Sequence, residues 1–562
     1  GIGPARNSRR ALRSSSNSCA ANEKLPEKIL KKFGRSDLMI QNWKIVRESI
    51  DARDKNNIFL VYSVDFTAVF RKNPNKRVRL ASNDKIKLEI APTQVYQLPK
   101  PGESVETGAD EGAGAAADAV SKEAPMLHSR PVVIGFGPAG MFAALILAQA
   151  GYAPIVLERG QNVEKRTESV KKFWEEGVLN PQSNVQFGEG GAGTFSDGKL
   201  TTGIKDMRIA KVLTELVRAG APEDILYKQK PHVGTDVLRK VVKSVREEII
   251  RLGGDVRFNT QAVGLIAEGG KLRELKLASV DESGNYASEE ILPCETAIFA
   301  IGHSARDTFR MLHESGIQMQ QKPFSIGFRI EHPQDLIDRA QYGVPAGSLG
   351  LPPAEYKLNH RCENGRGVYT FCMCPGGEVV VASSQNGGVV TNGMSYRDRA
   401  SGTANSALLC DVRVTDFESE NVLAGVEFQE KYERLAFENG GGNYCPPKAS
   451  WGALRDGKAP AVENSLPGFA MQAFREAMPY LGRKLKGFDD DDAVVTAVET
   501  RSSSPVRFAR DENYEGSIGM QTLHGFYPCG EGAGYAGGIT SAAVDGIRVA
   551  ESIIRRFLPS DM

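Results

Sequence analysis

The sequence lacks the features that mark several classes of protein. It has no uninterrupted apolar stretch of the roughly 18–20 residues that a membrane-spanning helix needs, because the best candidate, residues 141–157, contains Gln149, Gly151 and Pro154. Eight cysteines are scattered over 562 residues, and no two have the C-x2-C spacing of a zinc site. Such a low density does not build a disulfide scaffold. We therefore expect no membrane span, no metal site and a reducing compartment.

The sequence also lacks a strong excess of charge of one sign. Its formal net charge is +1, which provides no general attraction to nucleic acid or to acidic lipid. A local excess occurs in residues 23–99, which hold 16 Lys and Arg against 9 Asp and Glu. Part of this excess lies in RKNPNKRVRL (71–80). The pattern indicates a solvated hairpin or, alternatively, a surface that contacts RNA or a partner protein.

Composition sets the first 127 residues apart. Residues 1–22 contain four Arg, five Ser and no acidic residue, which is typical of a plastid or mitochondrial transit peptide, or else of a disordered basic tail. We expect a location in the chloroplast stroma, with the mitochondrion or the cytoplasm as alternatives. Residues 101–127, rich in Gly, Ala, Glu and Asp, predict a flexible linker.

Residues 23–100 predict a small α/β domain of the ferredoxin-like type. The expected helices are 25–33 and 42–55, and the expected strands are 57–66 and 85–90. Beyond the linker, apolar strands alternate with helical patterns to residue 562, as in an α/β fold.

A glycine-rich pattern, G-x-G-x-x-G, occurs three times, starting at Gly135, Gly188 and Gly532. By itself the pattern is weak evidence for a nucleotide site, so its surroundings decide. The first match, GFGPAG, follows the apolar stretch PVVI and opens a helix that ends at Gly151, after which a second strand leads to Glu158. That is the βαβ context of a dinucleotide-binding fold.

Each part of this first match has a physical role. Gly135 permits the tight turn, Gly137 lets a pyrophosphate approach the backbone, and Gly140 brings the helix close to the strand. The helix N-terminus offers unpaired N–H groups and a positive dipole end to the phosphates. Glu158 can accept hydrogen bonds from an adenosine ribose and would repel a 2′-phosphate. The segment therefore predicts FAD or NAD rather than NADP.

The other two matches have different surroundings. GAGYAG follows GFYP and Gly530-Glu531 and precedes a helix from about Ile539, and no acidic-tipped strand comes after it. It resembles the C-terminal motif of glutathione-reductase-type FAD proteins, in which a Gly-Asp pair binds the ribityl chain and pyrophosphate, although Glu531 stands here in place of Asp. The stretch FGEGGAGTFSDGKL (187–200) contains five glycines. We interpret it as backbone packed against the pyrophosphate and the flavin edge, or else as a plain surface loop.

Two further segments agree with this superfamily. TAIFAIGHSARD contains Ala300-Ile301-Gly302, which resembles the Ala-Thr-Gly strand found near the cofactor. DVRFNTQAVGLIAEGG (255–270) resembles the segment whose backbone meets the adenine, which would place Val263 at that base.

Taken together, residues 128–562 resemble a family of FAD-dependent dehydrogenase-like proteins of bacteria and plastids, whose members are largely uncharacterised. The motifs that carry the resemblance are GFGPAG, FGEGGAGTFSDGKLTT, KPHVGTDVL, AIGHSARDTF, TFCMCPGG, ETRSSSPVR and GEGAGYAGGITSAAVDG. We expect an α/β architecture with a Rossmann-type FAD-binding domain at 128–330 and 495–562. Because residues 331–494 mix strand and helix patterns without a βαβ rhythm, we interpret them as an inserted mixed α/β substrate lobe. The resemblance implies FAD binding and a redox role, but no particular substrate. We expect non-covalent FAD and a small-molecule substrate, and because the sequence has only one complete Rossmann unit, NAD(P)H would bind transiently or a protein such as ferredoxin would supply the electrons.

The residues expected at the cofactor come from the three glycine-rich stretches, the strand that ends at Glu158, and the two further segments at 255–270 and 296–307. They are Gly135, Gly137, Pro138, Ala139, Gly140, Glu158, Arg159, Gly190, Gly193, Thr194, Gly198, Lys199, Leu200, Val263, Ala300, Gly302, Gly530, Glu531, Gly538 and Ile539.

The candidates for catalysis are less specific. Cys372 and Cys374, two apart in FCMCPGG, would present both thiols on one face of a strand, as redox-active groups, as flavin contacts or as core residues. Glu499 and Arg501 indicate either an arginine that binds an anionic substrate or a structural salt-bridge network. His303 is either a proton donor or a turn residue.

These observations favour an FAD-dependent oxidoreductase that acts on an unidentified small metabolite. Two alternatives stay open. One is a flavin-dependent RNA-modifying enzyme that grips RNA through its basic N-terminal domain, and the other is a non-catalytic binding or assembly protein on the same fold.

Overall fold

The computed structural model describes residues 5–8, 25–82, 87–90, 96–103, 124–281 and 284–560. Its centre is a five-stranded parallel sheet in the order β24-β11-β5-β6-β7. The strands are β5 (Val132–Ile134), β6 (Ile155–Leu157), β7 (Asp255–Arg257), β11 (Ala297–Phe299) and β24 (Phe526–Pro528). All but β7 are buried along their whole length, as expected of a parallel sheet covered on both faces.

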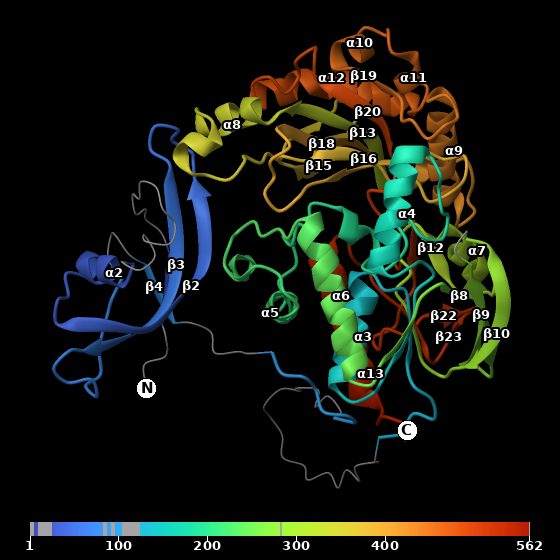
Figure 1. The fold of residues 1–562 in the computed structure, drawn as a ribbon, viewed down its shortest axis with the longest axis horizontal. Coiled ribbons are helices and arrows are strands. Elements are labelled where there is room, and N and C mark those ends of the chain that lie inside the picture. Colours follow the sequence, from blue (N-terminus) through green and yellow to red (C-terminus); the bar gives the residue numbers. More distant parts are fainter. Residues whose placement is uncertain are drawn as a thin grey trace.

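Helices cover one face of this sheet and an antiparallel sheet covers the other (Figure 1). The helices are α3 (Pro138–Gln149), α6 (Thr235–Arg251) and α13 (Ile539–Arg556), and the antiparallel strands are β8 (Thr260–Glu268), β9 (Lys271–Val280) and β10 (Tyr286–Pro293). Alternation along β5 separates the two layers, because Val133 packs with the helices whereas Val132 and Ile134 pack with β8 and β9.

Helix α3 accounts for much of the apolar stretch 141–157. Residues 139–148 of this helix are all buried, so α3 is apolar on every side because it lies inside the core. Among the helices that the structure describes, none combines the length and the apolarity that crossing a bilayer requires.

A second sheet, here called the cap together with its helices, stands above the parallel sheet (Figure 1). Its strand order is β14-β15-β18-β13-β20-β19. The strands are β13 (Phe324–Pro333), β14 (Asn359–Arg361), β15 (Gly367–Cys374), β18 (Thr403–Val412), β19 (Lys448–Ser450) and β20 (Val494–Glu499). Its helices are α8 (Gln334–Tyr342), α9 (Ala424–Asn439), α10 (Trp451–Arg455), α11 (Pro460–Glu463) and α12 (Gly468–Lys484).

The cap is longer than the lobe expected at 331–494. Strand β13 already pairs with β18 from Phe324, and β20 continues the same sheet to Glu499. The sequence boundaries fall inside these two strands, because nothing in a buried apolar run shows to which of two sheets it pairs.

The remaining elements connect these layers. They are α4 (Val163–Glu176), α5 (Arg208–Arg218), α7 (Arg306–Glu314), β12 (Met319–Gln321), β16 (Glu378–Val381), β17 (Thr391–Met394), β21 (Val506–Phe508), β22 (Ser517–Ile518) and β23 (Gln521–Thr522).

The N-terminal domain is a four-stranded antiparallel sheet with one described helix. The elements are β1 (Ala5–Ser8), α2 (Leu25–Phe33), β2 (Leu38–Asp51), β3 (Phe59–Phe70) and β4 (Lys87–Ile90). The sheet order is β2-β3-β1-β4, which is the order of a βαββαβ ferredoxin-like domain. The described residues 71–82, between β3 and β4, form no second helix.

One secondary-structure prediction in this domain is wrong. The helix expected at 42–55 is instead the second half of β2 and the turn after it, because this segment pairs with β3 in a long hairpin. Cross-strand pairing outweighs a weak helical period there. Within the segment expected to be a transit peptide or a disordered tail, residues 5–8 form β1. The rest of the expected leader, apart from β1, and most of the expected linker (104–123) lie outside the described residues.

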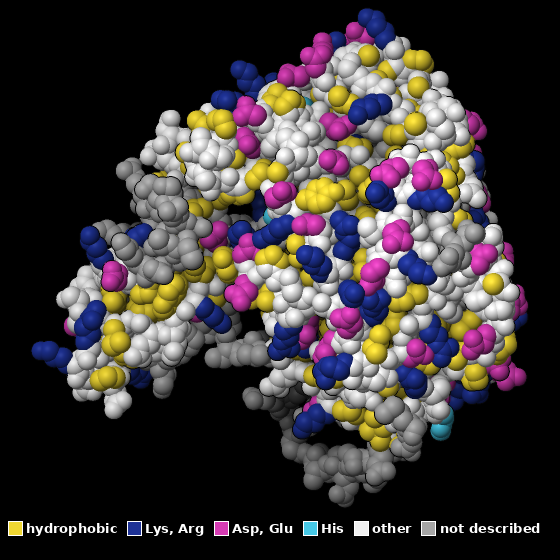
Figure 2. Space-filling view, viewed as in Figure 1, with side chains coloured by type: hydrophobic (Ala, Val, Ile, Leu, Met, Phe, Trp, Pro, Cys, Tyr) yellow, Lys and Arg dark blue, Asp and Glu magenta, His cyan; other side chains and the backbone are white. Residues whose placement is uncertain are grey.

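The hairpin β2-β3 contacts both large units. Glu48 exchanges backbone hydrogen bonds with the loop before α6, donating to Tyr227 at 2.7 Å and accepting from Gln229 at 2.8 Å. Lys55 Nζ, at the hairpin turn, donates to the carbonyl of Ala340 in α8 at 2.7 Å. Figure 2 shows Lys and Arg interspersed with Asp and Glu over this face, with no large area of one charge visible there.

Candidate functional site

A cavity of about 390 Å³ lies where the parallel strands end below the cap. Its walls come from the loops after β5, β6 and β11, the stretch 187–200, the start of β8, strands β15 and β17, and the N-terminus of α13. Its volume is within the range of about 300–1,000 Å³ that small-molecule and cofactor sites occupy. The carboxyl ends of parallel strands are also where open α/β sheets bind ligands.

The three glycines of GFGPAG have the backbone geometry expected for a tight turn, for close approach of a ligand and for helix–strand packing. Gly135 has a φ of +94°, which favours glycine. A Cβ on Gly137, the N-cap of α3, would meet only the Gly191 Cα at 3.7 Å, so this cavity-lining position has room for a ligand. A Cβ on Gly140 would lie 1.9 Å from the Gly135 carbonyl oxygen. Gly140 therefore serves helix–strand packing and does not line the cavity.

Glu158, at the end of β6, lines the cavity and also orders the loops around it. Its carboxylate accepts backbone N–H groups from Phe136 at 2.8 Å, Gly160 at 2.9 Å and Gly188 at 3.0 Å. Because a carboxylate has about four acceptor sites, one is still available to a ribose hydroxyl. The neighbouring Arg159 is paired with Asp307 through two hydrogen bonds of 2.9 and 2.7 Å.

The C-terminal motif places Glu531 in the cavity and Gly530 outside its lining. Gly530 has a φ of +74° and presses against α3, where its Cβ would lie 2.6 Å from that of Ala139. Burial raises the pKa of Glu531 to about 7, against the opposing effect of Lys322. Gly538, the N-cap of α13, lines the cavity without a side-chain cap.

The stretch 187–200 is divided between cavity and core. Gly193, Gly198 and Lys199 line the cavity, as expected. Gly190, Thr194 and Leu200 do not, because the Gly190 N–H donates to Phe136, the Thr194 hydroxyl donates to Glu189, and Leu200 is buried in the core with α3 and α6. Composition identified the stretch, but only packing decides which of its residues face the cavity.

The residue expected at the adenine, Val263, is not part of the cavity wall. Thr260, Gln261 and Ala262 line the cavity. An irregularity in the pairing of β8 with β9 falls at this point, between residues 262 and 264, and no sequence pattern located it. Ala300 and Gly302, after β11, line the cavity as expected, as do Pro138, Ala139, Arg159 and Ile539.

The two cysteines do not share a face as a regular strand would require. Pairing of β15 with β18 is irregular between residues 371 and 374, and Cys372 has a φ of +42°, which is uncommon outside glycine. Cys372 lines the cavity and Cys374 does not. A hydrogen bond from Cys374, together with Arg329 and Lys199, lowers the pKa of Cys372 to about 6.

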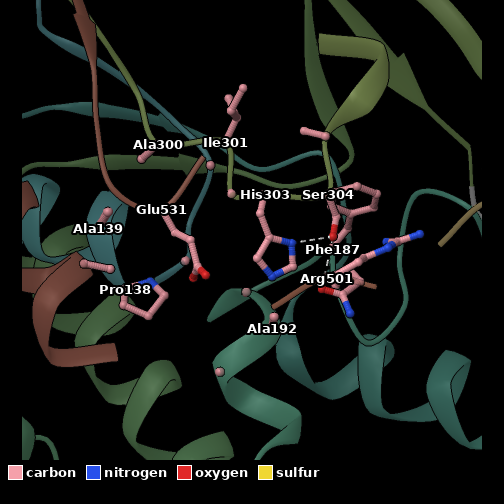
Figure 3. A pocket seen from close by; sticks show the side chains of 18 of the residues that line it. Pro138, Ala139, Phe187, Ala192, Ala300, Ile301, His303, Ser304, Arg501 and Glu531 are labelled. Carbon is pink, nitrogen blue, oxygen red and sulfur yellow. Dashed lines mark hydrogen bonds between the residues drawn. The ribbon is translucent and has the colours of Figure 1, made fainter. Parts of the chain in front are cut away.

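His303 enters the cavity from the loop after β11 (Figure 3). Its Nδ1 lies 2.8 Å from the Ser304 hydroxyl, and that hydroxyl donates to Gln186 at 3.2 Å. Because the Ser304 hydroxyl gives its proton to Gln186, it must accept from His303, so Nδ1 carries the proton of the neutral ring. Nε2 is then a hydrogen-bond acceptor. Burial, with Arg501 and Arg306 nearby, lowers the pKa of His303 to about 3, so the ring is neutral at pH 7.

Arg501 lines the cavity but is already paired with a carboxylate. Its Nε and one terminal nitrogen donate to Glu433 at 3.0 and 2.7 Å, and its other terminal nitrogen donates to Ser384. Arg306 also grips Glu433, through two hydrogen bonds of 2.8 and 2.7 Å. Burial favours the neutral acid, but the two guanidinium groups hold the pKa of Glu433 well below its usual range.

A second buried pair supports the cap side of the cavity. Arg329 donates through two nitrogens to Glu499, and also to the carbonyl of Cys372 at 2.9 Å and to Asn392 at 2.9 Å. Burial raises the pKa of Glu499 to about 7 even beside this arginine. The sequence left two interpretations of Glu499 and Arg501, an arginine that binds an anionic substrate or a structural salt-bridge network. Their contacts with other described residues match the salt-bridge network.

Several residues that line the cavity or support its wall were not identified from sequence. Gln186 and Ser304 hold His303, Arg329 holds the loop of Cys372, and Asn392 comes from β17. Arg329 lies among the buried apolar residues of β13, where a charged side chain indicates that a buried partner exists.

Comparison with known proteins gives a family but no activity. Residues 323–502 match a family model described as FAD-dependent protein, C-terminal domain-like, and residues 11–67 match a domain of unknown function. An uncharacterised protein of Clostridium beijerinckii is 45% identical over 551 residues, which cover 95% of this chain and 96% of that protein.

Similarity to solved structures is weaker. The flavin-dependent brominase Bmp2 is 12% identical, with 76% of this chain and 79% of that chain covered and a TM-score of 0.35. A 3-ketosteroid-delta4-(5alpha)-dehydrogenase from Rhodococcus jostii RHA1 is 13% identical, with 81% and 99% covered and a TM-score of 0.35. Scores this low carry no inference about activity. The chain belongs to the same family as the Clostridium beijerinckii protein, and its cap coincides with the region that matches FAD-dependent protein, C-terminal domain-like.

Proposed function

We propose that this protein binds one FAD non-covalently in the cavity and is a flavin-dependent oxidoreductase of a small molecule. The observation that carries the proposal is that one cavity joins the dinucleotide loop and Glu158 to Glu531 and Cys372, which are far apart in the sequence. The match of residues 323–502 to the C-terminal region of FAD-dependent proteins supports it.

The residues present fit FAD on three counts. The N-termini of α3 and α13 both reach the cavity, so unpaired N–H groups can face the pyrophosphate and a negatively charged flavin. A Cβ at Gly302, Gly537 or Gly538 would meet nothing within 4 Å, which leaves room beside the backbone. Glu158 keeps an acceptor for the ribose.

A bound flavin would supply hydride or electron transfer, while the chain supplies binding, orientation and charge. Lys199, held by the carbonyl of Met373, brings a cation to the cavity beside Cys372. Phe371, on β15 of the cap, and Thr391 and Asn392, on the adjoining strand β17, form part of the wall, so we assign the substrate to the cap side. Cys372, with its pKa lowered to about 6, and Glu531, with its pKa raised to about 7, are the groups best suited to exchange a proton there.

Visible absorbance of the purified protein tests cofactor binding. We expect about one bound flavin per chain, released intact by denaturation, and anaerobic bleaching by NADH, NADPH or reduced ferredoxin. Protein that neither contains flavin nor takes up added FAD would contradict the proposal. If the protein binds FAD but none of these donors reduces it, the proposed cofactor site would stand, and the proposed oxidoreductase activity with these donors would be contradicted.

A further inference from the structure

A cluster of metal-ligand side chains lies in the cap, away from the flavin cavity. The Nδ1 or Nε2 of His360, the Sγ of Cys362 and a carboxylate oxygen of Glu476 all lie within 4.8 Å of one another. None of the three residues lines the cavity. We propose that they bind a Zn²⁺ ion, which would join the edge strand β14 to helix α12.

The spacing of the ligand atoms suits a zinc ion. Zinc bonds of about 2.0–2.3 Å in a tetrahedron place neighbouring ligand atoms roughly 3.3–3.8 Å apart. His360 Nε2 and Glu476 Oε1 are already 3.8 Å apart. The widest separation in the cluster, at most 4.8 Å, closes with side-chain movements of about 1 Å.

The fold holds each ligand in place. His360 lies in β14 and Cys362 follows two residues later, so both project to the same side. Glu476 comes from α12, and its Oε1 accepts the Glu363 N–H at 2.8 Å. The His360 ring stacks on Tyr480, with centroids 4.1 Å apart and the planes at 13°. Such supporting contacts orient ligands before the metal arrives.

The ligand types select the ion. A thiolate and a carboxylate balance the two charges of Zn²⁺, and neutral imidazole completes a set of one S, one N and one O ligand. Thiolate and imidazole disfavour Mg²⁺ and Ca²⁺, which prefer oxygen. The His360 and Glu476 side chains are 17% and 28% exposed, so water can reach a fourth position.

The absence of C-x2-C spacing predicted that the protein has no metal site. The pattern in this cluster is H-x-C on a strand, with its third ligand far downstream on a helix. Only the packing of α12 against β14 brings them together.

Equilibrium dialysis of the untagged, full-length protein against Zn²⁺, with metal counted by mass spectrometry, tests the proposal. We expect the unaltered protein to retain one more Zn²⁺ than Cys362→Ser or Glu476→Gln. The dissociation constant should rise by at least about 100-fold, the upper end of what losing a supporting contact costs. Cys445→Ser, which changes an exposed cysteine outside the cluster, should bind as the unaltered protein does.

Thermal unfolding supplies a second readout. An ion that binds only the folded state stabilises it by RT ln(1 + [ion]/Kd) and so raises the Tm once its concentration exceeds Kd. Zn²⁺ should therefore raise the Tm of the unaltered protein and of Cys445→Ser alone. Unchanged flavin content would show that the cluster variants are folded. Equal Zn²⁺ retention by all four proteins, or equal Tm shifts, would overturn the site.

Discussion

The Glu158 carboxylate and the Phe136 backbone N–H are joined by a hydrogen bond of 2.8 Å, across the turn that begins the dinucleotide loop. The same carboxylate also holds the N–H groups of Gly160 and Gly188. The residue expected to recognise a ribose thus also sets the shape of the loops that face the phosphates. Substitution of Glu158 should therefore affect both ribose binding and the conformation of these loops.

Glu158→Ala should therefore remove flavin and also lower stability. Each abandoned buried N–H costs about 1–3 kcal/mol, and the ribose acceptor is lost as well. Flavin per chain and the urea midpoint measure the two effects. Glu175→Ala, which breaks an exposed ion pair with Lys171, is the control and should change neither. A Glu158→Ala protein that contains as much flavin per chain as the unaltered protein would contradict the proposed cofactor site.

Two glycines of one motif should respond in opposite ways. Gly137→Ala has room in the folded chain, whereas a Cβ at Gly140 collides with the Gly135 carbonyl. We expect Gly137→Ala to keep its Tm and to weaken FAD binding by about tenfold or more, or about 1.4 kcal/mol. Gly140→Ala should lose about 1–3 kcal/mol of stability through overpacking. The same loss of stability in both would show that Gly137 serves packing alone.

Replacing the buried Glu433 carboxylate, which lies between two arginines, with a neutral group should lower the free energy of unfolding. Glu433→Gln leaves Arg306 and Arg501 facing each other without a counter-charge. Breaking a buried pair in this way costs about 3–5 kcal/mol, which chemical denaturation measures. Glu418→Gln disrupts the exposed pair with Lys431 and should have no measurable effect. Similar denaturation curves for both variants would contradict the network.

Flavin affinity should fall as pH rises through about 7. Burial raises the pKa of Glu531 to about 7 in the empty cavity, so the neutral acid dominates below that pH and can donate a hydrogen bond. Above it, the carboxylate repels the anionic phosphates. Titration of flavin-free protein with FAD at pH 6 and pH 8 measures this difference. Glu531→Gln, which stays neutral, should abolish it, and a pH slope unchanged in that variant would exclude Glu531 as its source.

Cys372 should react as a thiolate at neutral pH. Its pKa of about 6, lowered by Cys374, Arg329 and Lys199, leaves it mostly ionised at pH 7, while an ordinary thiol has a pKa of about 8.5. Alkylation of flavin-free protein by iodoacetamide, followed by peptide mass spectrometry, should label Cys372 before the exposed Cys445. Bound FAD should protect Cys372. Slower labelling of Cys372 than of Cys445 in the flavin-free protein would contradict the lowered pKa.

The local elements and the cofactor motif could be predicted from sequence. A glycine turn between an apolar strand and an apolar helix has one favourable geometry, so Gly135, Gly137 and Glu158 lie at the cavity as expected. The helix at 25–33 and the strand at 57–66 follow from their own periods; the helix has the same ends as α2, and the strand differs from β3 by two and four residues at its ends. In these segments local propensity and the tertiary contacts favour the same conformation.

Tertiary structure alone decided which side chains meet. Residues 42–51 form part of β2 because β3 lies beside them, and a pairing irregularity turns Cys372 toward the cavity and keeps Cys374 out of its wall. Arg501 belongs to a network because Glu433, on α9, packs behind it. Local sequence determines the conformation of a turn or a helix, whereas the partner of a buried charge depends on packing between segments that no local pattern relates.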